Sequence, residues 1–317
     1  MSEISGIHHV TAICGDAQEN LDFYAGVLGM RLVKKSVNQD DPRTYHLFYA
    51  DADGHPGTDL TFFPFQHSPA GRLGIGLGVE IALAIPTGSL DFWKARLAEH
   101  GTRLLDTESR RGDRALPFID PHGQALALVE TREAREFRAW DRSPVPGEHQ
   151  IRGLHGVRLW ERELAPTVGF VTSVLGFSDY GEEHGWHRYG VDGGGSGKHV
   201  EIRELSNVPR GSWGVGTMHH VAWRVADESV ELAVRERIEH AHRRPTAVID
   251  RFWFHSVYFL EPGGVLFELA TEGPGFTADE DLEHLGEQLV LPPWLEPQRR
   301  EIEAALPPLS AAPLLEA

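Results

Sequence analysis

Gly6-Ile7-His8-His9-Val10 opens this chain, and Thr217-Met218-His219-His220-Val221 repeats the pattern in its second half. Each pair of histidines lies in a short apolar run that is followed by a helical pattern and further strands. Because neighbouring residues of a strand face opposite ways, only one histidine of each pair can point into a given cavity. Histidine is the commonest metal ligand in proteins. The repeat therefore indicates duplicated modules that each contribute a histidine to one metal centre.

Extending the two stretches outward reveals four modules with the same predicted order, β-α-β-β-β. Glycine follows the predicted helices as a C-cap, for example Gly29 after the helix of the first module. The turn that begins at Asp120-Pro121 in the second module recurs at Glu261-Pro262 in the fourth. The sequence thus predicts an α+β fold built from four βαβββ modules. They span residues 6–64, 79–130, 153–204 and 217–270.

A proline-rich stretch at residues 143–147 divides the chain into halves. We expect an N-terminal domain at residues 1–145 with modules one and two, and a C-terminal domain at 146–271 with modules three and four. Residues 272–317 form a tail whose proline pairs break any long helix, although 296–306 can form a short one. Its apolar residues predict that the tail wraps over the modules. They are Phe276, Leu282, Leu285, Leu291 and Trp294.

Composition bounds the class of protein. Apolar (41%) and charged (24%) contents are those of an ordinary globular chain, and the net charge of −17 argues against nucleic-acid and anionic-membrane partners. No apolar run approaches the roughly 20 residues of a spanning helix, and the N-terminus lacks a signal-peptide pattern. A single cysteine, Cys14, excludes an intramolecular disulfide. We expect a soluble, cytoplasmic protein.

The third candidate ligand is Glu268, in the strand pattern 265–270. Burying an unpaired carboxylate costs several kcal/mol, so Glu268 needs a metal, a cationic partner or a solvent-facing position. With His9 and His220 it completes a set of two histidines and one carboxylate. That set is the facial triad of non-haem Fe(II) oxygenases, which leaves positions open for substrate and dioxygen.

The chain resembles the vicinal oxygen chelate superfamily of glyoxalases, extradiol dioxygenases and fosfomycin-resistance proteins. Within it, nearly all 317 residues resemble the hydroquinone-type ring-cleaving dioxygenases. The resemblance implies two tandem domains with U-shaped mixed sheets. The matching stretches include residues 6–13, 45–51, 211–213, 219–220, 262–268 and 275–281.

In that family the second histidine of each pair and the strand glutamate bind iron, which implies His9, His220 and Glu268 here. The preceding histidines, His8 and His219, would then lie around the ligands or face the substrate, where we expect them to act in catalysis.

Family members also carry a threonine two residues after the first ligand, and an arginine and a tyrosine ahead of the glutamate. Thr11 and Arg251 are thus predicted to bind substrate, and Tyr258 to act in catalysis. For Thr11, a role as a β-forming core residue is nearly as well supported.

The resemblance implies an extradiol-type dioxygenase that uses Fe(II) to insert O2 into a hydroquinone or catechol. Mn(II) also tolerates these donors. The expected partners are a small aromatic substrate, O2 and, by base rate, a second copy of the chain in a homodimer.

Three alternatives remain. A glyoxalase-type lyase or isomerase would bind Zn or Ni with a fourth ligand, and only Asp59 could supply it, since counting along the strand places Thr61 opposite Glu268. A binding or resistance protein would hold an aromatic compound without redox metal. A third-module site would use His155, which we place at that module's ligand position, with Glu201; we interpret His155 instead as a relic or a core histidine.

Overall fold

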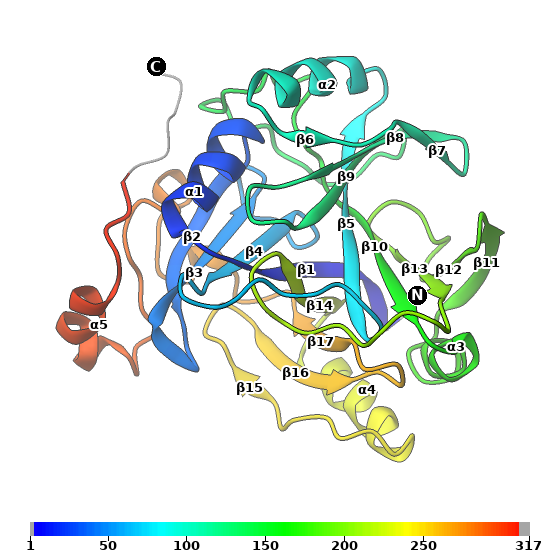
Figure 1. The fold of residues 1–317 in the computed structure, drawn as a ribbon. Coiled ribbons are helices and arrows are strands. Elements are labelled where there is room, and N and C mark those ends of the chain that lie inside the picture. Colours follow the sequence, from blue (N-terminus) through cyan, green and yellow to red (C-terminus); the bar gives the residue numbers. More distant parts are fainter. Residues whose placement is uncertain (1–2, 311–317) are drawn as a thin grey trace.

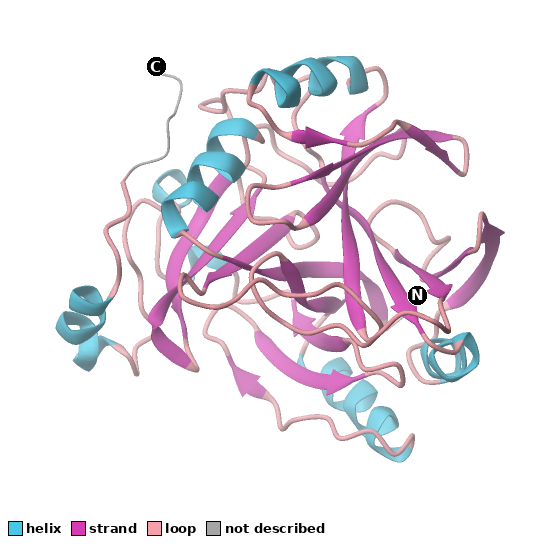
Figure 2. Ribbon diagram, viewed as in Figure 1, coloured by secondary structure: helices cyan, strands magenta, loops and turns pink. Residues whose placement is uncertain are grey.

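Two mixed β-sheets form the centre of the molecule, and the longer helices lie around their outside (Figures 1 and 2). The structure is a computed structural model that describes residues 3–310. It confirms the α+β class and the repeated module plan. Each module begins with a long central strand, continues into a helix, and returns with strands that extend the sheet.

The first sheet combines modules one and four. At its centre the first strands of the two modules pair antiparallel, and each is flanked by a parallel strand of its own module. Its strands in spatial order are β15 (Ile249–Asp250), β16 (His255–Leu260), β17 (Leu266–Thr271), β14 (Thr217–Val225), β1 (Ile4–Cys14), β4 (Asp59–Pro64), β3 (Asp41–Ala50) and β2 (Arg31–Asn38).

The second sheet combines modules two and three in the same way. Each sheet therefore takes one module from each half of the chain, while the domain boundaries at residues 145 and 271 stay a prediction. Its strands in spatial order are β11 (Ser178–Glu183), β12 (Trp186–Gly190), β13 (His199–Glu204), β10 (Gly153–Glu161), β5 (Leu77–Pro86), β9 (Ala125–Thr131), β8 (Asp113–Ile119) and β6 (Arg103–Leu104), with β7 (Glu108–Arg110) paired to β8.

A helix follows the first strand of every module. Asp16 and Asp227 cap the first and fourth helices by accepting hydrogen bonds from backbone N–H groups three residues on. Gly29 ends the first helical segment with a φ of +70°, as its C-cap position predicts. No helix within residues 3–310 is long and apolar enough to cross a membrane. The helices are α1 (Ala17–Leu21), continued by the π-helix η1 (Asp22–Val27), α2 (Leu90–Glu99), α3 (Leu164–Ser173) and α4 (Glu228–His240).

Part of the C-terminal segment lies along β2. Lys34 of β2 is fully buried and pairs with Asp279 at 2.7 Å and with Glu280 at 2.5 Å. Phe276, Leu285 and Leu291 are buried, and Trp294 is 45% exposed with its ring centroid 6.2 Å from that of Phe252. The short helices of this segment are η2 (Phe276–Ala278), η3 (Leu282–His284), η4 (Glu296–Gln298) and α5 (Arg299–Ala305), and the tail beyond residue 310 lies outside the described residues.

Candidate metal centre

Three side chains that the sequence singled out meet on one face of the first sheet. Nε2 of His9 lies 3.2 Å from Nε2 of His220 and 3.2 Å from Oε2 of Glu268, and Nε2 of His220 lies 2.9 Å from the same oxygen. All three side chains are buried. No other group of His, Cys, Asp or Glu in residues 3–310 brings three ligand atoms within 4.8 Å of one another.

The register of the sheet explains why these residues converge. His9 of β1 pairs with Ala222 of β14, and Ala222 pairs with Glu268 of β17, so the three residues lie in one row across the strands. His220 lies two residues before Ala222 on the middle strand and therefore faces the same side. Because Ala222 is small, the side chains on either side can lean together over it.

The distances match a metal bound by three protein ligands. Ligand atoms about 2.1 Å from a metal lie about 3.0 Å apart on a face of an octahedron and about 3.4 Å apart in a tetrahedron. The measured set of 2.9 to 3.2 Å is closer to the octahedral face. Oε2 of Glu268 is buried without a donated hydrogen bond from any described residue. Such an orphaned carboxylate oxygen fits a cation at this point.

The charges at the site also favour a cation. Burial alone would raise the pKa of Glu268, but the two imidazoles beside it hold that pKa well below its usual value. Burial lowers the pKa of His220, which favours the neutral imidazole that a metal requires. The site thus presents an ionised carboxylate and, at His220, a neutral nitrogen donor.

The histidine before each candidate histidine ligand contacts that ligand at Nδ1, away from the metal-facing Nε2. Nδ1 of His8 lies 2.9 Å from Nδ1 of His9, and Nδ1 of His219 lies 2.8 Å from Nδ1 of His220. Burial is the main reason that the pKa of His8 and the pKa of His219 both fall to about 3. A hydrogen bond at Nδ1 of a ligand fixes its tautomer and leaves Nε2 free to bind a metal. Neither His8 nor His219 lines the cavity over the triad.

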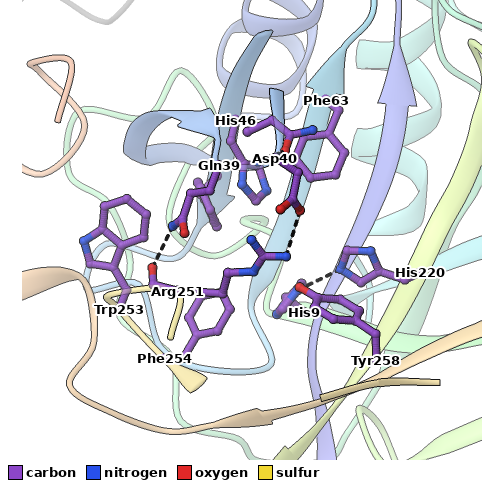
Figure 3. Close-up of a pocket in the computed structure, with 12 residues that line it drawn as sticks. His9, Gln39, Asp40, His46, Phe63, His220, Arg251, Trp253, Phe254 and Tyr258 are labelled. Carbon is purple, nitrogen blue, oxygen red and sulfur yellow. Dashed lines mark hydrogen bonds and ion pairs between the residues drawn. The ribbon is translucent and has the colours of Figure 1, made fainter. Parts of the chain in front are cut away.

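A cavity lies above the triad, and Arg251 and Asp40 stand at its mouth (Figure 3). Nη2 of Arg251 lies 2.9 Å from Oδ2 of Asp40, and Gln39 donates a hydrogen bond of 2.9 Å to the carbonyl of Arg251. The cavity volume is about 30 Å³, enough for one or two water molecules. It is lined by His9, Asn38, Gln39, Asp40, His46, Phe48, Phe63, His220, Arg251, Trp253, Phe254 and Tyr258.

The other predicted site residues lie near the triad. Tyr258 of β16 pairs with Glu268, lines the cavity, and has its ring under the guanidinium of Arg251 at 5.4 Å. Burial and the charge of Glu268 raise the pKa of the Tyr258 hydroxyl, which therefore remains a hydrogen-bond donor. Thr11 pairs with His220 but is fully buried and does not line the cavity; its hydroxyl lies 2.7 Å from that of Thr61.

Sequence reasoning overlooked several residues of the cavity wall. Asp40 and Phe254 lie in segments without any repeat or motif of their own, and His46 lies in the matching stretch 45–51 but was given no role there. For His46 a signal existed, since it alternates with Phe48 on a strand that leads into the sheet. The ion pair of Asp40 with Arg251 joins module one to module four. Nothing in the sequence around either residue indicates this contact.

The fourth ligand needed by a lyase is absent from the described cluster. Asp59 pairs with His9 on the neighbouring strand, but its carboxylate does not join the ligand atoms. Burial raises the pKa of Asp59 well above its usual value, which favours the neutral acid. Thr61 has the place on β4 that Glu268 has on β17, as expected, because each pairs with the residue two positions after the histidine of its module. Asp59 lies two residues earlier and so on the same face.

The second sheet lacks an equivalent centre among the described residues. Its register gives Gly156 the place of His9, Ala127 the place of Glu268 and Glu80 the place of His220. The placement of His155 at the third module's ligand position was wrong by one residue, since Gly156 has that position and His155 lies at an irregularity of β10. His155 is buried and its Nδ1 lies 3.0 Å from the hydroxyl of Ser196.

Arginines fill the space around the corresponding carboxylates of that sheet. Arg110 pairs with Glu80 at 2.5 Å, and Arg158 and Arg188 each approach Glu201 to 2.9 Å. Glu201 is therefore neutralised by guanidinium groups, and it is not free for a metal.

Comparison with known proteins identifies the relatives of this site. Residues 6–128 match the Glyoxalase/Bleomycin resistance protein/Dioxygenase superfamily. MhqA of Bacillus subtilis, provisionally named a ring-cleaving dioxygenase, is 41% identical over 97% of this chain and 99% of its own length. The chain belongs to the ring-cleaving dioxygenase family of this superfamily.

Two further members of that family are similar over their whole length. The chlorohydroquinone/hydroquinone 1,2-dioxygenase of Sphingobium indicum is 31% identical over 94% of this chain and 95% of that protein. A crystal structure from Bacillus subtilis, provisionally titled a dioxygenase, superposes with a TM-score of 0.90 at 38% identity, covering 98% of this chain and 99% of that one. These likenesses confirm the resemblance expected from the sequence and the fold that it implied.

Proposed function

We propose that this protein is an Fe(II)-dependent ring-cleaving dioxygenase that inserts O2 into a hydroquinone- or catechol-type ring. The observation that carries the proposal is the buried triangle of His9, His220 and Glu268, whose edges fit three ligands on one face of an octahedron. Ring cleavage next to a hydroxyl group, in the manner of extradiol enzymes, is part of the proposal. Family membership supports this chemistry.

The three ligands hold the metal, and Fe(II) supplies the one-electron chemistry with dioxygen that no side chain provides. Mn(II) suits the same donors. Zn or Ni in a lyase would need a fourth ligand, and the neutral, displaced Asp59 does not favour one. A binding protein without a redox metal would not explain why a buried carboxylate oxygen lies between two imidazoles without a hydrogen bond.

The surrounding residues have distinct proposed roles. His8 and His219 hold the ligand imidazoles through Nδ1 and are placed to move a proton along that bond. The neutral hydroxyl of Tyr258 donates to a substrate oxygen in the cavity. Arg251, once its ion pair with Asp40 opens, neutralises an anionic ring oxygen. The proposal also includes a homodimer in the cytoplasm, although no residue described above argues for either.

The test is anaerobic loading with Fe(II), followed by oxygen uptake with a panel of hydroquinones and catechols. Iron-dependent uptake with a ring-opened product, abolished in His9→Ala and Glu268→Ala, supports the proposal. Uptake that persists in both variants, or tight binding of Zn with no uptake, contradicts it. Trp294→Ala, which alters an exposed tail residue, is the matched control.

A further inference from the structure

His46 lies in the cavity wall and has no part in the proposed function so far. It belongs to β3, and its ring lies between Phe48 and Phe63, with centroid distances of 3.9 and 4.4 Å. Figure 3 shows its imidazole on the far side of the cavity from Tyr258. Two aromatic neighbours restrict the rotation of the ring, so the direction of its nitrogens is fixed by packing.

A chain of two hydroxyls leads from His46 back into the sheet. Nε2 of His46 lies 2.9 Å from the hydroxyl oxygen of Thr61, which lies 2.7 Å from the hydroxyl oxygen of Thr11. Both threonines are fully buried. Within residues 3–310 the hydroxyl of Thr11 has no other hydrogen-bond partner, and that of Thr61 has only these two.

The two hydroxyl protons determine which group donates in each of these hydrogen bonds. If Thr61 donated to Thr11, the hydroxyl proton of Thr11 would be buried without an acceptor, at a cost of about 1 to 3 kcal/mol. If Thr11 donates to Thr61, and Thr61 donates to Nε2 of His46, both hydroxyl protons are used. The second arrangement makes Nε2 an acceptor, so the proton of a neutral His46 must be on Nδ1.

The environment keeps His46 neutral. Burial is the main cause, and the neighbouring His9, His220 and Arg251 add to it, so that the pKa of His46 lies well below its usual value. Nδ1 of His46 has no hydrogen-bond partner among the described residues, and it is not one of their fully buried unpaired polar atoms. Since the ring lines the cavity, the Nδ1–H is available to a molecule inside it.

We propose that His46 contacts the bound ring, and that its Nδ1–H donates a hydrogen bond to a ring oxygen that is not at the metal. This inference rests on the proposed function, since it concerns how the same cavity holds an aromatic substrate. Thr61 is a positioning residue that acts through His46. Thr11, predicted to bind substrate, then acts only through this chain, because its own hydroxyl does not reach the cavity.

Anaerobic binding to the iron-loaded protein tests the contact without turnover. Hydroquinone has a second ring oxygen and phenol lacks it. In His46→Phe we expect the Kd of hydroquinone to rise about tenfold, the value of one hydrogen bond, and the Kd of phenol to stay within about twofold. Equal changes for both ligands, or no change for hydroquinone, would overturn the proposal.

Thr61 provides a variant that does not touch the cavity. Thr61→Val keeps the shape but removes the hydroxyl, and we expect it to weaken hydroquinone by about three- to tenfold while phenol is unaffected. Thr61→Ser is the matched control and should restore the Kd. If Thr61→Val binds hydroquinone as the unaltered protein does, the positioning role is wrong.

The tautomer gives a second readout, free of iron and turnover. In the metal-free full chain, ¹⁵N NMR of His46 should show the proton on Nδ1. In Thr61→Val we expect a detectable share of the tautomer with the proton on Nε2. An Nε2–H tautomer in the unaltered protein would overturn the proposal. If hydroquinone binding depends on His46 but no ring cleavage occurs, only the proposed function is wrong. If ring cleavage occurs but hydroquinone binding does not depend on His46, only the role of His46 is wrong.

Discussion

The hydroxyl of Ser256 donates a hydrogen bond of 2.6 Å to Oε1 of Glu268, and this bond turns Oε2 toward the two imidazoles. Ser256 and Tyr258 lie on the same face of β16, where Tyr258 pairs with Glu268 and Ser256 pairs with Ala270 in the next row. One neighbour therefore orients the carboxylate while the other faces the cavity. Orientation by such a partner decides how well a ligand binds its metal.

Ser256→Ala should lower the affinity for Fe(II) by about 10- to 100-fold, because the carboxylate loses the group that orients it. Competition with a chelator of known affinity measures the change. Ser36→Ala is the matched control, since Ser36 is also buried but bonds to the carbonyl of Val290, away from the triad. Equal losses in both variants would mean that Ser256 serves only stability.

Asp40→Asn should speed the anaerobic association of hydroquinone by about three- to tenfold. The cavity of about 30 Å³ is too small for a ring, given that an engineered cavity of about 150 Å³ holds benzene, so the pair of Asp40 and Arg251 must part for entry. The pair is exposed on the Asp40 side, so stability should change by less than about 1 kcal/mol.

Stopped-flow binding measures this rate. Asp41→Asn, on the same hairpin but without a contact to Arg251, should leave the rate unchanged. An association rate that is the same in Asp40→Asn and the unaltered protein would show that the ion pair does not limit entry.

Lys34→Met should destabilise the fold by about 2 to 4 kcal/mol. It leaves Asp279 and Glu280 without their buried cation, and removing one partner of such a pair costs more than the pair contributes. Denaturant unfolding gives the free energy. Lys35→Met, on the partly exposed side of β2, should cost less than about 1 kcal/mol, and a similar cost for both would contradict the role of Lys34 in holding the tail.

Stability should fall as pH rises from about 5 to about 9 because of Glu161. Burial, followed by the nearby carboxylate of Glu261, raises the pKa of Glu161 to about 9. The folded state then binds a proton that the unfolded state has released, so folding weakens between the two pKa values. Glu161→Gln should flatten this slope and be more stable by at least about 1 kcal/mol at pH 8.

Unfolding by denaturant at pH 5 and pH 8 measures the slope. The control is Glu163→Gln, because Glu163 is exposed two residues further along the chain. Parallel pH profiles for Glu161→Gln and the unaltered protein would show that Glu161 is ionised in the fold.

Much of this fold follows from local sequence. Apolar periodicity located the long strands and every module helix, because a buried face needs apolar residues at a fixed spacing. It missed β6, β7, β11 and β15, which are mostly polar and lie at the margins of the sheets. Periodicity also gave no sign that modules one and four pair, since contacts between distant strands leave no periodic signal; only the repeated histidine pairs indicated that the two modules share one site.

The centre of the site was predictable and its surroundings were not. His9, His220 and Glu268 stood out because a metal needs few residue types, and those types recur in the repeat. Whether His8 faces the substrate depends on local strand geometry, where His8 and His9 contact each other through Nδ1. The roles of His46 and Asp40 depend on partners far away in the sequence.

The most direct test of the central claim is the reaction under ¹⁸O2. The iron-loaded protein is given hydroquinone, and the ring-opened product is analysed by mass spectrometry. A dioxygenase acting at His9, His220 and Glu268 predicts that both atoms of one O2 enter the product, and that Glu268→Ala forms none. A product that contains no ¹⁸O, or one that Glu268→Ala still forms, would contradict the account.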